Sequence, residues 1–386
     1  MSETPLRIAI VRGRYNAFGG AERFVNNALA ALAKENVSMS VIAREWEGEA
    51  AGVDVVRCKA FSVGRLWRDI AFARCVCERT APGAFDLVQS HERIPCCDVF
   101  RAGDGVHAEW LRQRARGQNP LARIGTTLSP YHIYMKRMER RLFESPRLRA
   151  VICNSHMVRK EIEKEFDIAP AKLRVIYTGV DTHKFHPSCK EARAAVRARF
   201  KVPADVPLFL FVGSGFERKG VALCLDALTR MPRAHLMVVG YDKASAKFEA
   251  MAYDFGVQAR TYFVGPQPDT RLFYGAADAF VLPAIYDPLP NAALEAMASG
   301  LPVIVSYKTG TAELITPGRE GELCDAQDPD GLARAFYSLG EYEDVGRMGR
   351  TARQLAERFD TQRMARELVS LYKELLASPP SRAASA

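Results

Sequence analysis

The chain has 386 residues, of which 48% are hydrophobic and 26% are charged, and its formal net charge is +9. This composition excludes a disordered chain, a fibre and a coiled coil, and the length fits two domains or one large domain. No apolar run approaches the roughly 20 residues that a bilayer span requires. The N-terminal apolar run 6–11 is too short for the core of a signal peptide, so we expect a cytoplasmic protein.

Strand-like apolar runs alternate with helical patterns in the first half of the chain. The expected strands are 7–11, 38–43, 53–57, 87–90, 98–102, 150–154 and 173–176, and the expected helices include 21–34 and 157–166. The second half repeats the scheme, with strands at 208–213, 235–240, 260–264, 279–282 and 303–306 and helices at 220–228, 243–255, 269–276, 292–298, 329–338 and 341–359. The alternation predicts the α/β class, with two doubly wound domains in tandem and a parallel sheet in each.

The expected domain boundaries follow from these two blocks. We place an N-terminal domain at 1–185, a C-terminal domain at 186–363, and a final helix with a frayed tail at 364–386, for which packing back on the N-terminal domain is one option. Ligands of open α/β sheets bind beyond the carboxyl ends of the strands. The expected site is therefore the cleft between the two domains, lined by the loops that follow the strands.

Nine cysteines are spread along the chain at irregular spacing, and none forms a C-x-x-C pair. The odd count and the irregular spacing disfavour both a disulfide framework and a zinc site. We therefore expect reduced thiols that are mostly packed in the interior. The nine are Cys58, Cys75, Cys77, Cys96, Cys97, Cys153, Cys189, Cys224 and Cys324.

Positive charge is concentrated in the segment 110–150, which holds ten Lys and Arg residues against two acids and so accounts for +8 of the net +9. Trp110, Tyr131, Tyr134 and Phe143 are interleaved with these charges. A basic segment with aromatic residues suits a nucleic acid, an anionic membrane surface or a phosphorylated substrate. A solvated helix face without a partner is the remaining interpretation, and charge alone does not choose among the four.

Two loops that follow expected strands offer groups suited to a phosphate. After the first strand, Gly19 and Gly20 precede a helix whose first N–H groups can approach an anion, although a plain turn explains them equally well. In the loop after the expected strand 208–213, Arg218 and Lys219 supply fixed positive charge for a pyrophosphate; the alternative is a solvated pair without a ligand. ATP hydrolysis is disfavoured, because Val221 stands where a P-loop has its lysine.

A third loop supplies carboxylates. Asp287 follows the expected strand 279–282, and Glu295 lies in the helix after it, where it can accept hydrogen bonds from the vicinal diol of a ribose or simply stabilise the helix start. Residues 328–330 have the spacing of a metal-binding D-x-D motif, but they do not have its place in the chain. They directly precede an expected helix, so we interpret them as a helix cap and assign no metal.

These loops lie within longer motifs that resemble those of the family 4 glycosyltransferases with the GT-B fold. The motifs occur in that family's order, at 18–23, 175–181, 213–220 and 262–305. The resemblance spans almost the whole chain and implies two Rossmann-like domains that face each other across a cleft. A closer likeness, carried by 46–48, 98–109, 239–243 and 247–250, is to the bacterial lipopolysaccharide core glucosyltransferases that act on heptose.

The resemblance implies that the C-terminal domain binds a nucleotide-sugar donor. Glu295 matches the second acid of the family's E-x7-E motif, which holds the donor ribose, and Asp287 stands where the first Glu usually meets a hydroxyl of the transferred sugar. Arg218 and Lys219 match the pair that neutralises the leaving diphosphate. The other implied donor-binding residues are Gly19, Gly20, Gly213, Ser214, Gly215, Leu289, Pro290 and Asn291.

The resemblance also implies an acceptor site in the N-terminal domain. Asp104 falls where the close relatives have an acid beside the reacting centre. His91 and Glu92 follow a strand, so both are expected to contact the acceptor. His107 lies near Asp104 and is the alternative acceptor contact, although a lone histidine on such a loop is more often structural. The expected catalytic residues are Asp104, Arg218, Lys219 and Asp287, and the expected acceptor-binding residues are His91, Glu92, Asp104 and His107.

The implied activity is that of a retaining glycosyltransferase. It moves a hexose, expected to be glucose, from a UDP-sugar to the lipopolysaccharide core, and it uses neither a cofactor nor a metal. Its acceptor is a lipid-anchored, phosphorylated saccharide, so segment 110–150 is expected to meet the anionic inner membrane from the cytoplasmic side. One alternative is another donor, such as UDP-N-acetylhexosamine, or another acceptor in O-antigen or capsule synthesis. The other, a nucleic-acid-binding protein, leaves the donor loops unexplained, so we expect no nucleic acid among the partners.

Overall fold

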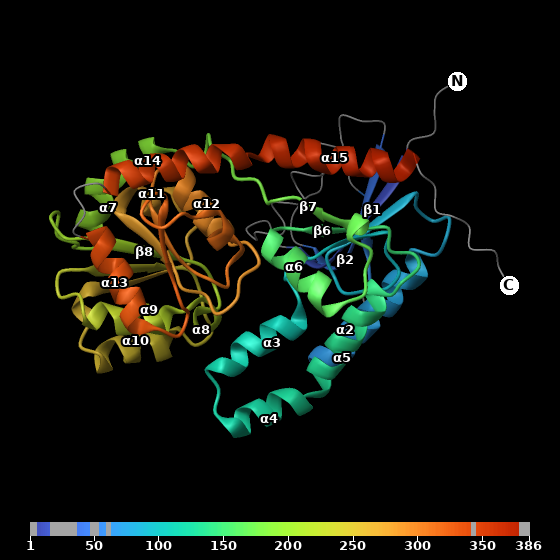
Figure 1. Ribbon diagram of the computed structural model, residues 1–386, viewed down its shortest axis with the longest axis horizontal. Coiled ribbons are helices and arrows are strands. Elements are labelled where there is room, and N and C mark those ends of the chain that lie inside the picture. The colour runs from blue at the N-terminus through green and yellow to red at the C-terminus, as the bar shows by residue number, and fades with distance from the viewer. Residues whose placement is uncertain (1–5, 16–36, 47–53, 59–62, 341–344, 378–386) are drawn as a thin grey trace. The chain divides into compact units, whose positions relative to one another are not determined.

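The computed structural model describes residues 6–15, 37–46, 54–58, 63–340 and 345–377. The chain divides into two compact units, Met1–Tyr177 with Gln362–Ala386, and Thr178–Thr361. Each unit is built on one parallel sheet with helices on its faces (Figure 1). The predicted α/β class with two doubly wound sheets is therefore confirmed.

The sheet of the first unit has seven parallel strands in the order β3-β2-β1-β4-β5-β6-β7. Its apolar runs are continuous, as in parallel strands that are covered on both faces. In β1, Ile8 and Ile10 enter one core and Ala9 and Val11 the other, because successive side chains point to opposite faces. The strands are β1 (Leu6–Tyr15), β2 (Val37–Trp46), β3 (Asp54–Arg57), β4 (Leu87–Ser90), β5 (Val99–Arg101), β6 (Ala150–Cys153) and β7 (Leu173–Val175).

Helices cover both faces of this sheet. On one face, α2, α5 and α6 contribute Val76, Leu142 and Ile162 to the core, and α2 and α5 lie side by side (Figure 1). The other face is covered by α15, which packs Leu368 and Tyr372 against it. The helices are α2 (Gly64–Arg79), α3 (His107–Arg116), α4 (Pro120–Leu128), α5 (Pro130–Phe143), α6 (His156–Glu165), the short η1 (Pro170–Lys172) and α15 (Thr361–Ala377).

The sheet of the second unit has six parallel strands in the order β10-β9-β8-β11-β12-β13. Phe209 of β8 stacks on Phe336 of α13, with ring centroids 4.1 Å apart. The strands are β8 (Leu208–Val212), β9 (His235–Val239), β10 (Thr261–Gly265), β11 (Ala279–Leu282), β12 (Val303–Ser306) and β13 (Gly321–Cys324). The α-helices are α7 (Arg193–Arg199), α8 (Phe216–Lys219), α9 (Val221–Thr229), α10 (Ser245–Asp254), α11 (Arg271–Ala276), α12 (Asn291–Ala298), α13 (Pro329–Gly340) and α14 (Val345–Ala356). The 3-10 turns are η2 (Pro187–Ala192), η3 (Gln258–Arg260), η4 (Gly310–Leu314) and η5 (Glu357–Phe359).

Each sheet reverses its strand order at one place. β1 lies between β2 and β4, and β8 lies between β9 and β11. In sheets of this class the ligand binds outside the carboxyl ends of the strands at such a switch point. In the first unit, Arg12 and Gly13 of β1 directly follow its last pair with β4, and His91 follows β4; in the second unit, Gly213 follows β8 and Pro283 follows β11. The expected helix 21–34 lies outside the described residues.

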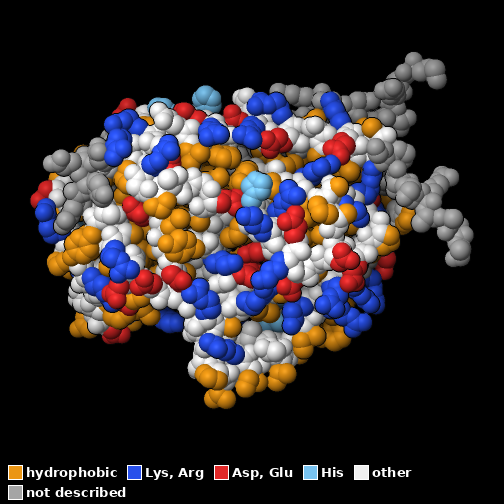
Figure 2. Space-filling view, viewed as in Figure 1, with side chains coloured by type: hydrophobic (Ala, Val, Ile, Leu, Met, Phe, Trp, Pro, Cys, Tyr) orange, Lys and Arg blue, Asp and Glu red, His pale blue; other side chains and the backbone are white. Residues whose placement is uncertain are grey.

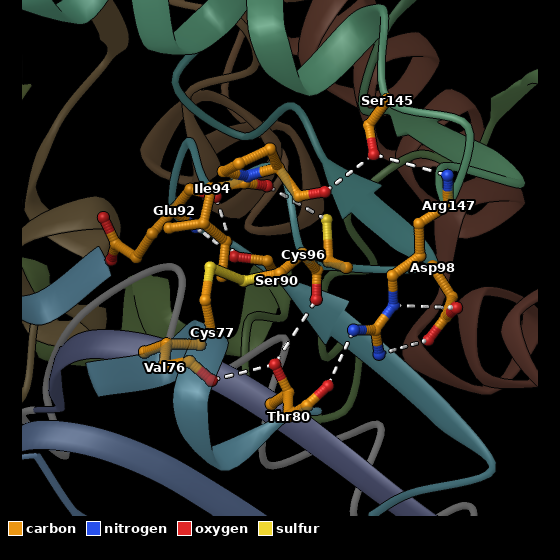
Figure 3. Close-up of a disulfide and its surroundings, with 12 residues drawn as sticks. Val76, Cys77, Thr80, Ser90, Glu92, Ile94, Cys96, Asp98, Ser145 and Arg147 are labelled. Atoms are coloured by element: carbon orange, nitrogen blue, oxygen red, sulfur yellow. Dashed lines mark hydrogen bonds and ion pairs between the residues drawn. A yellow bond between two sulfur atoms is a disulfide. The ribbon is translucent and has the colours of Figure 1, made fainter. Parts of the chain in front are cut away.

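The expectation that all the thiols are reduced is wrong for four cysteines. Cys58 is joined to Cys75 and Cys77 to Cys96, although the partners are 17 and 19 residues apart in the chain. Helix α2 carries Cys75 and Cys77 and brings them within 5.9 Å and 5.4 Å, Cα to Cα, of their partners. Figure 3 shows the Cys77–Cys96 bridge beside the loop that follows β4. The free cysteines are Cys97, Cys153, Cys189, Cys224 and Cys324.

Candidate active site

The loop after β8 folds so that Lys219 lies against Gly213. A Cβ on Gly213 would stand 2.8 Å from Cδ and 3.1 Å from Nζ of Lys219, so only glycine leaves room for this side chain. Gly215 precedes α8 with φ 78°, in the left-handed region that glycine adopts at little cost. The N–H of Phe216 donates to Oδ2 of Asp242 at 2.7 Å, which fixes the loop to the residues that follow β9.

Asp287 pairs with both cations of this loop. Its Oδ2 lies 3.3 Å from Nη1 of Arg218 and 3.3 Å from Nζ of Lys219, and its side chain is 11% exposed. Burial alone would raise the pKa of Asp287, but the charges of Lys219 and Arg218 outweigh burial and hold the pKa below its usual value. The three side chains form a cluster with one positive charge in excess, beyond the carboxyl ends of β8 and β11.

Backbone hydrogen bonds fix the loop that carries Asp287. The N–H of Ile285 donates to the carbonyl of Arg218 at 2.9 Å, so this loop is tied directly to α8. The N–H of Asp287 donates to the carbonyl of Lys308 at 3.0 Å, and its own carbonyl accepts from the N–H of Gly310 at 2.9 Å. The positions of Asp287 and Arg218 are therefore set by the main chain, before any ligand binds.

Helix α12 begins directly after this loop. Leu289 and Pro290 are buried, Asn291 is the first helical residue, and no side chain caps the first turn. The N–H groups at a helix start carry partial positive charge and favour an anion. Glu295, one turn further, is 3% exposed, and one of its oxygens accepts from the hydroxyl of Tyr274 at 3.0 Å.

Most of the predicted donor residues thus gather at one edge of the second sheet. They are Gly213, Ser214, Gly215, Arg218, Lys219, Asp287, Leu289, Pro290 and Asn291. Glu295 lies further along α12, against Tyr274, a residue that sequence analysis did not select. Gly19 and Gly20, the remaining two predicted donor residues, lie outside the described residues.

In the first unit, the switch point carries an ion pair. Oε1 of Glu92 accepts from the backbone N–H of Gly13 at 2.9 Å and lies 3.4 Å from Nη1 of Arg12. The side chain of Glu92 is 33% exposed, so a ligand can still reach it. Glu92, predicted to contact the acceptor, is therefore held just beyond the end of β4, against the part of β1 that follows its last pair with β4.

His91 precedes Glu92 and is buried, with 6% of its surface exposed. Its Nε2 lies 3.0 Å from Nε2 of Gln89, and Oε1 of Gln89 accepts from the hydroxyl of Tyr372 at 2.6 Å. Burial, with the charges of Arg101 and Arg12, holds the pKa of His91 well below its usual value. The ring is therefore neutral at pH 7.

Asp104 is exposed in the turn between β5 and α3. The side chains of Arg93 and Glu139 support that turn. Arg93 donates from Nη2 to the carbonyl of Gly105 at 2.8 Å and from Nε to Glu139 at 2.9 Å. Glu139 is 1% exposed and also accepts from the N–H of His107, at 3.0 and 3.1 Å to its two oxygens. Sequence analysis selected neither Arg93 nor Glu139. The one signal in the sequence was that Glu139 is one of only two acids in the basic segment 110–150.

His107 packs into the interior at the first turn of α3. It is 7% exposed, and its Nε2 lies 3.1 Å from Nδ1 of His132. Burial first, then the charges of Arg93 and His132, lower the pKa of His107 to about 3. The structure therefore places this predicted acceptor residue in a neutral histidine pair, where it packs as a structural histidine does.

The basic segment 110–150 folds mainly into α3, α4 and α5. Its exposed cations are Arg112, Arg116, Arg123, Lys136, Arg137, Arg140 and Arg141. Two others serve the fold: Arg147 pairs with Asp98 at 3.3 Å, and Arg149 donates to the carbonyl of Leu375. The positive surface is thus smaller than the sequence count suggests, and it lies on the helices.

Helix α4 exposes an apolar face. Leu121, Ile124 and Leu128 are 81%, 56% and 67% exposed, and their spacing places them on one side of the helix. In Figure 2 apolar side chains gather over α4, with basic side chains close by. An exposed apolar face bordered by cations is typical of a surface that meets a membrane or another protein.

A cavity of about 490 Å³ lies at the other end of the second sheet. Its walls include Pro207 and Asp278, which immediately precede β8 and β11, together with Met231 and Tyr337. None of the described donor residues lines it. The cavity is therefore separate from the predicted donor residues, which follow the carboxyl ends of the strands.

Asp328 caps α13, because its Oδ1 accepts from the N–H of Gly331 at 2.9 Å. This agrees with the interpretation of 328–330 as a helix start. Across the described parts of the chain, no three His, Cys, Asp or Glu side chains come together in a way that could hold a metal ion. In the same parts, no helix is both long enough and apolar enough to cross a membrane.

Comparison with known families decides the class of protein. Residues 192–355 match the family described as glycosyl transferases group 1, and residues 18–184 match glycosyltransferase family 4. The chain is a family 4 glycosyltransferase. One match lies within the second unit of the glycosyltransferase and the other lies almost wholly within the first, and together they confirm the enzyme class that the loop motifs predicted.

The glycosyltransferase is 27% identical over 369 residues to the lipopolysaccharide core biosynthesis glycosyltransferase LpsE of Rhizobium meliloti. The aligned part is 94% of this chain and 97% of LpsE. It is 26% identical over 321 residues to the lipopolysaccharide glucosyltransferase WaaG of Escherichia coli, covering 81% of this chain and 84% of WaaG.

Solved structures show the same fold. The crystal structure of WaaG, a glycosyltransferase involved in lipopolysaccharide biosynthesis, matches with a TM-score of 0.82 and 22% identity over 94% of this chain and 99% of WaaG. Anabaena HepE in complex with UDP-glucose matches with a TM-score of 0.74 and 18% identity over 96% of this chain and all of HepE's chain (100%). The glycosyltransferase therefore has the GT-B fold.

Proposed function

We propose that this glycosyltransferase is a retaining enzyme that transfers a hexose, glucose in the first instance, from a UDP-sugar to the lipopolysaccharide core oligosaccharide. The observation that carries the proposal is the cluster of Arg218, Lys219 and Asp287 beyond the carboxyl ends of β8 and β11. The names of LpsE and WaaG support this acceptor, and the UDP-glucose complex of HepE supports this donor.

In the proposed reaction the bond between the anomeric carbon and the diphosphate oxygen breaks, a hydroxyl oxygen of the acceptor forms the new bond to that carbon, and the hydroxyl proton leaves with the diphosphate. Negative charge then develops on the phosphate, and Arg218 and Lys219 stabilise it together with the N–H groups at the start of α12. When the diphosphate takes the place of Asp287 beside the two cations, the carboxylate becomes available to accept from a hydroxyl of the sugar. Glu295 accepts from the ribose diol, and Tyr274 orients its carboxylate.

On the acceptor side, we assign Asp104 as the acid beside the reacting centre. It is exposed in a turn that Arg93 and Glu139 hold in place. His91 and Glu92 at the switch point contact the acceptor in this scheme. The ring of His107 contacts His132, so in this scheme His107 supports the acceptor site through its position as the first residue of α3.

We further propose that α3, α4 and α5 hold the enzyme on the anionic inner membrane from the cytoplasmic side, where a lipid-anchored acceptor lies. Each well-placed cation contributes roughly 1 kcal/mol near such a surface. Burial of an exposed leucine contributes about 1.5–3 kcal/mol, and Leu121 and Leu128 of α4 are the most exposed of these. Charge attracts these helices to the surface, and α4 supplies the apolar contact.

The donor site is tested by calorimetric titration with UDP and a panel of nucleotide sugars, with and without EDTA. Metal-independent binding of one UDP-sugar to the wild type and its loss in Glu295→Ala is the expected result. Glu249→Ala, which changes an exposed acid on α10, serves as the matched control. Equal binding by wild type and Glu295→Ala would contradict the proposed donor site, and transfer to purified truncated lipopolysaccharide then tests the acceptor.

The membrane surface is tested by flotation with vesicles that contain an anionic phospholipid. We expect the double variant Leu121→Asp/Leu128→Asp, and separately Arg137→Glu/Arg140→Glu, to stay unbound while the wild type floats. Leu272→Asp is the matched control, because this leucine is 43% exposed on α11 in the other unit. Flotation of all variants alike would refute the assignment.

A further inference from the structure

A buried chain of three polar side chains joins the C-terminal helix to His91. The hydroxyl of Tyr372 on α15 donates to Oε1 of Gln89 at 2.6 Å, and Nε2 of Gln89 lies 3.0 Å from Nε2 of His91. Gln89 is 0%, Tyr372 1% and His91 6% exposed. Gln89 lies on β4, 283 residues before Tyr372, so the chain exists only because α15 packs on this sheet.

The direction of the hydrogen bonds is fixed at the tyrosine end. Burial raises the pKa of Tyr372, so its hydroxyl stays protonated and must donate. Among the described residues, Gln89 is the side chain that accepts this proton, and it does so with its carbonyl oxygen. The amide N–H of Gln89 is then left for His91. Flipping the amide would leave a buried phenol proton without an acceptor, which costs more than a hydrogen bond usually contributes.

The direction at Gln89 determines the state of His91. Because Gln89 donates, Nε2 of His91 must accept, and the proton of the neutral ring lies on Nδ1. A second ring proton would set N–H against N–H at this contact. Two nearby cations, Arg101 of β5 and Arg12 of β1, disfavour this second proton as well. Arg12 is itself paired with Glu92.

We propose that Gln89 and Tyr372 are positioning residues, which hold His91 as a neutral imidazole with its proton on Nδ1, so that the ring acts on the acceptor side as a hydrogen-bond donor and not as a general base. The part that concerns the acceptor rests on the proposed function, whereas the tautomer is inferred from the contacts that Gln89 makes with Tyr372 and His91. The C-terminal helix thereby becomes a functional part of the acceptor unit.

The tautomer is tested by NMR of the full chain labelled with ¹⁵N-histidine, with the His91 signals assigned by His91→Asn. We expect the Nδ1–H form without titration from about pH 5.5 to pH 8. In Gln89→Glu, a carboxylate accepts from Nε2–H, so the proton moves to Nε2 and the ring titrates near neutral pH. Wild-type His91 in the Nε2–H form, or titrating at its ordinary pKa, would overturn the proposal.

The functional half is tested by kinetics of Tyr372→Phe, which keeps the ring that packs on the sheet but removes the donor. We expect the KM for the acceptor to rise about five- to tenfold, the effect of one hydrogen bond, while the KM for the donor stays unchanged. Tyr337→Phe is the matched control, because that hydroxyl donates to the carbonyl of Arg230 in the other unit, at 2.7 Å. If the wild type shows the Nδ1–H tautomer but Tyr372→Phe leaves the acceptor KM unchanged, the proposed contact of His91 with the acceptor is refuted. The assignment of the tautomer would still stand.

Discussion

Replacing Gly213 by alanine is expected to weaken donor binding while the protein stays folded. The new Cβ would stand 2.8 Å from Cδ and 3.2 Å from Cε of Lys219, closer than non-bonded carbons approach each other. These atoms belong to a flexible side chain, so the lysine moves. The φ of 157° at Gly213 strains the backbone of an alanine there as well. Nζ of Lys219 then leaves its position 3.3 Å from Asp287, where the diphosphate is proposed to bind.

The size of the effect follows from the contacts that Lys219 gives up. A hydrogen bond to a charged group contributes roughly 1.5–3 kcal/mol, which corresponds to about a 10- to 150-fold increase in the Kd for a diphosphate. The free energy of unfolding is expected to fall by about 1–3 kcal/mol, because alanine is strained at the φ of 157° that Gly213 adopts, while Arg218 remains 3.3 Å from Asp287.

Calorimetric titration with UDP measures the Kd, and urea unfolding measures the stability. Gly346→Ala is the matched control in the same unit, since a Cβ there meets its nearest neighbour, Nη1 of Arg350, at an ordinary 3.6 Å. A Kd for UDP within about twofold of the wild-type value would refute the reasoning. It would mean either that Lys219 stays in place or that it does not meet the diphosphate.

Glu139→Gln is expected to lower the free energy of unfolding by about 3 kcal/mol, because the guanidinium of Arg93 stays buried without its counter-charge; urea unfolding measures this. Asp287→Asn is expected to flatten the acid side of the stability profile. The folded pKa of Asp287 lies below its unfolded value, so the carboxylate stabilises the fold above about pH 4 and loses this effect as the pH falls further; urea unfolding at several pH values follows it. Reducing the two disulfides of α2 is expected to cost roughly 3 kcal/mol each, since chain segments of 17 and 19 residues regain freedom; intact-mass spectrometry counts the bridges before and after.

Different results would contradict these three expectations. Wild-type stability in Glu139→Gln would show that this carboxylate does not compensate Arg93. Parallel pH profiles for wild type and Asp287→Asn would show that the two cations do not lower the pKa of Asp287. A mass that does not rise on reduction would show that the four cysteines are thiols in solution, as the sequence analysis expected.

The strand and helix alternation could be predicted because it depends on apolar patterns within a few residues. Strand ends were harder to predict. β1 and β2 continue past their apolar runs to Tyr15 and Trp46, because the two backbones remain paired there, with Arg14 opposite Glu45. A charged pair at the end of two neighbouring strands leaves no apolar signal in either sequence.

The candidate site was predictable where its parts are neighbours in the chain. Arg218 and Lys219 share one loop with the glycines that accommodate them, and the pattern of that loop was sufficient. Contacts between distant residues gave no such pattern: Arg93 meets Glu139 across 46 residues, and Gln89 meets Tyr372 across 283. The disulfides were missed for the same reason, since α2 creates the proximity and the odd number of cysteines argued against it.

The first unit takes its last helix from the end of the chain, and this has a consequence for synthesis. Ile8 and Ile10 line a core that Leu368 and Tyr372 complete, yet residues 178–361 must be made in between. At ordinary rates of translation this interval lasts roughly 10–40 s. During that time one apolar face of the nascent sheet is without its helix, which gives chaperones a defined period in which to bind. A chain that ended at residue 360 would keep that face uncovered permanently and is expected to aggregate on expression.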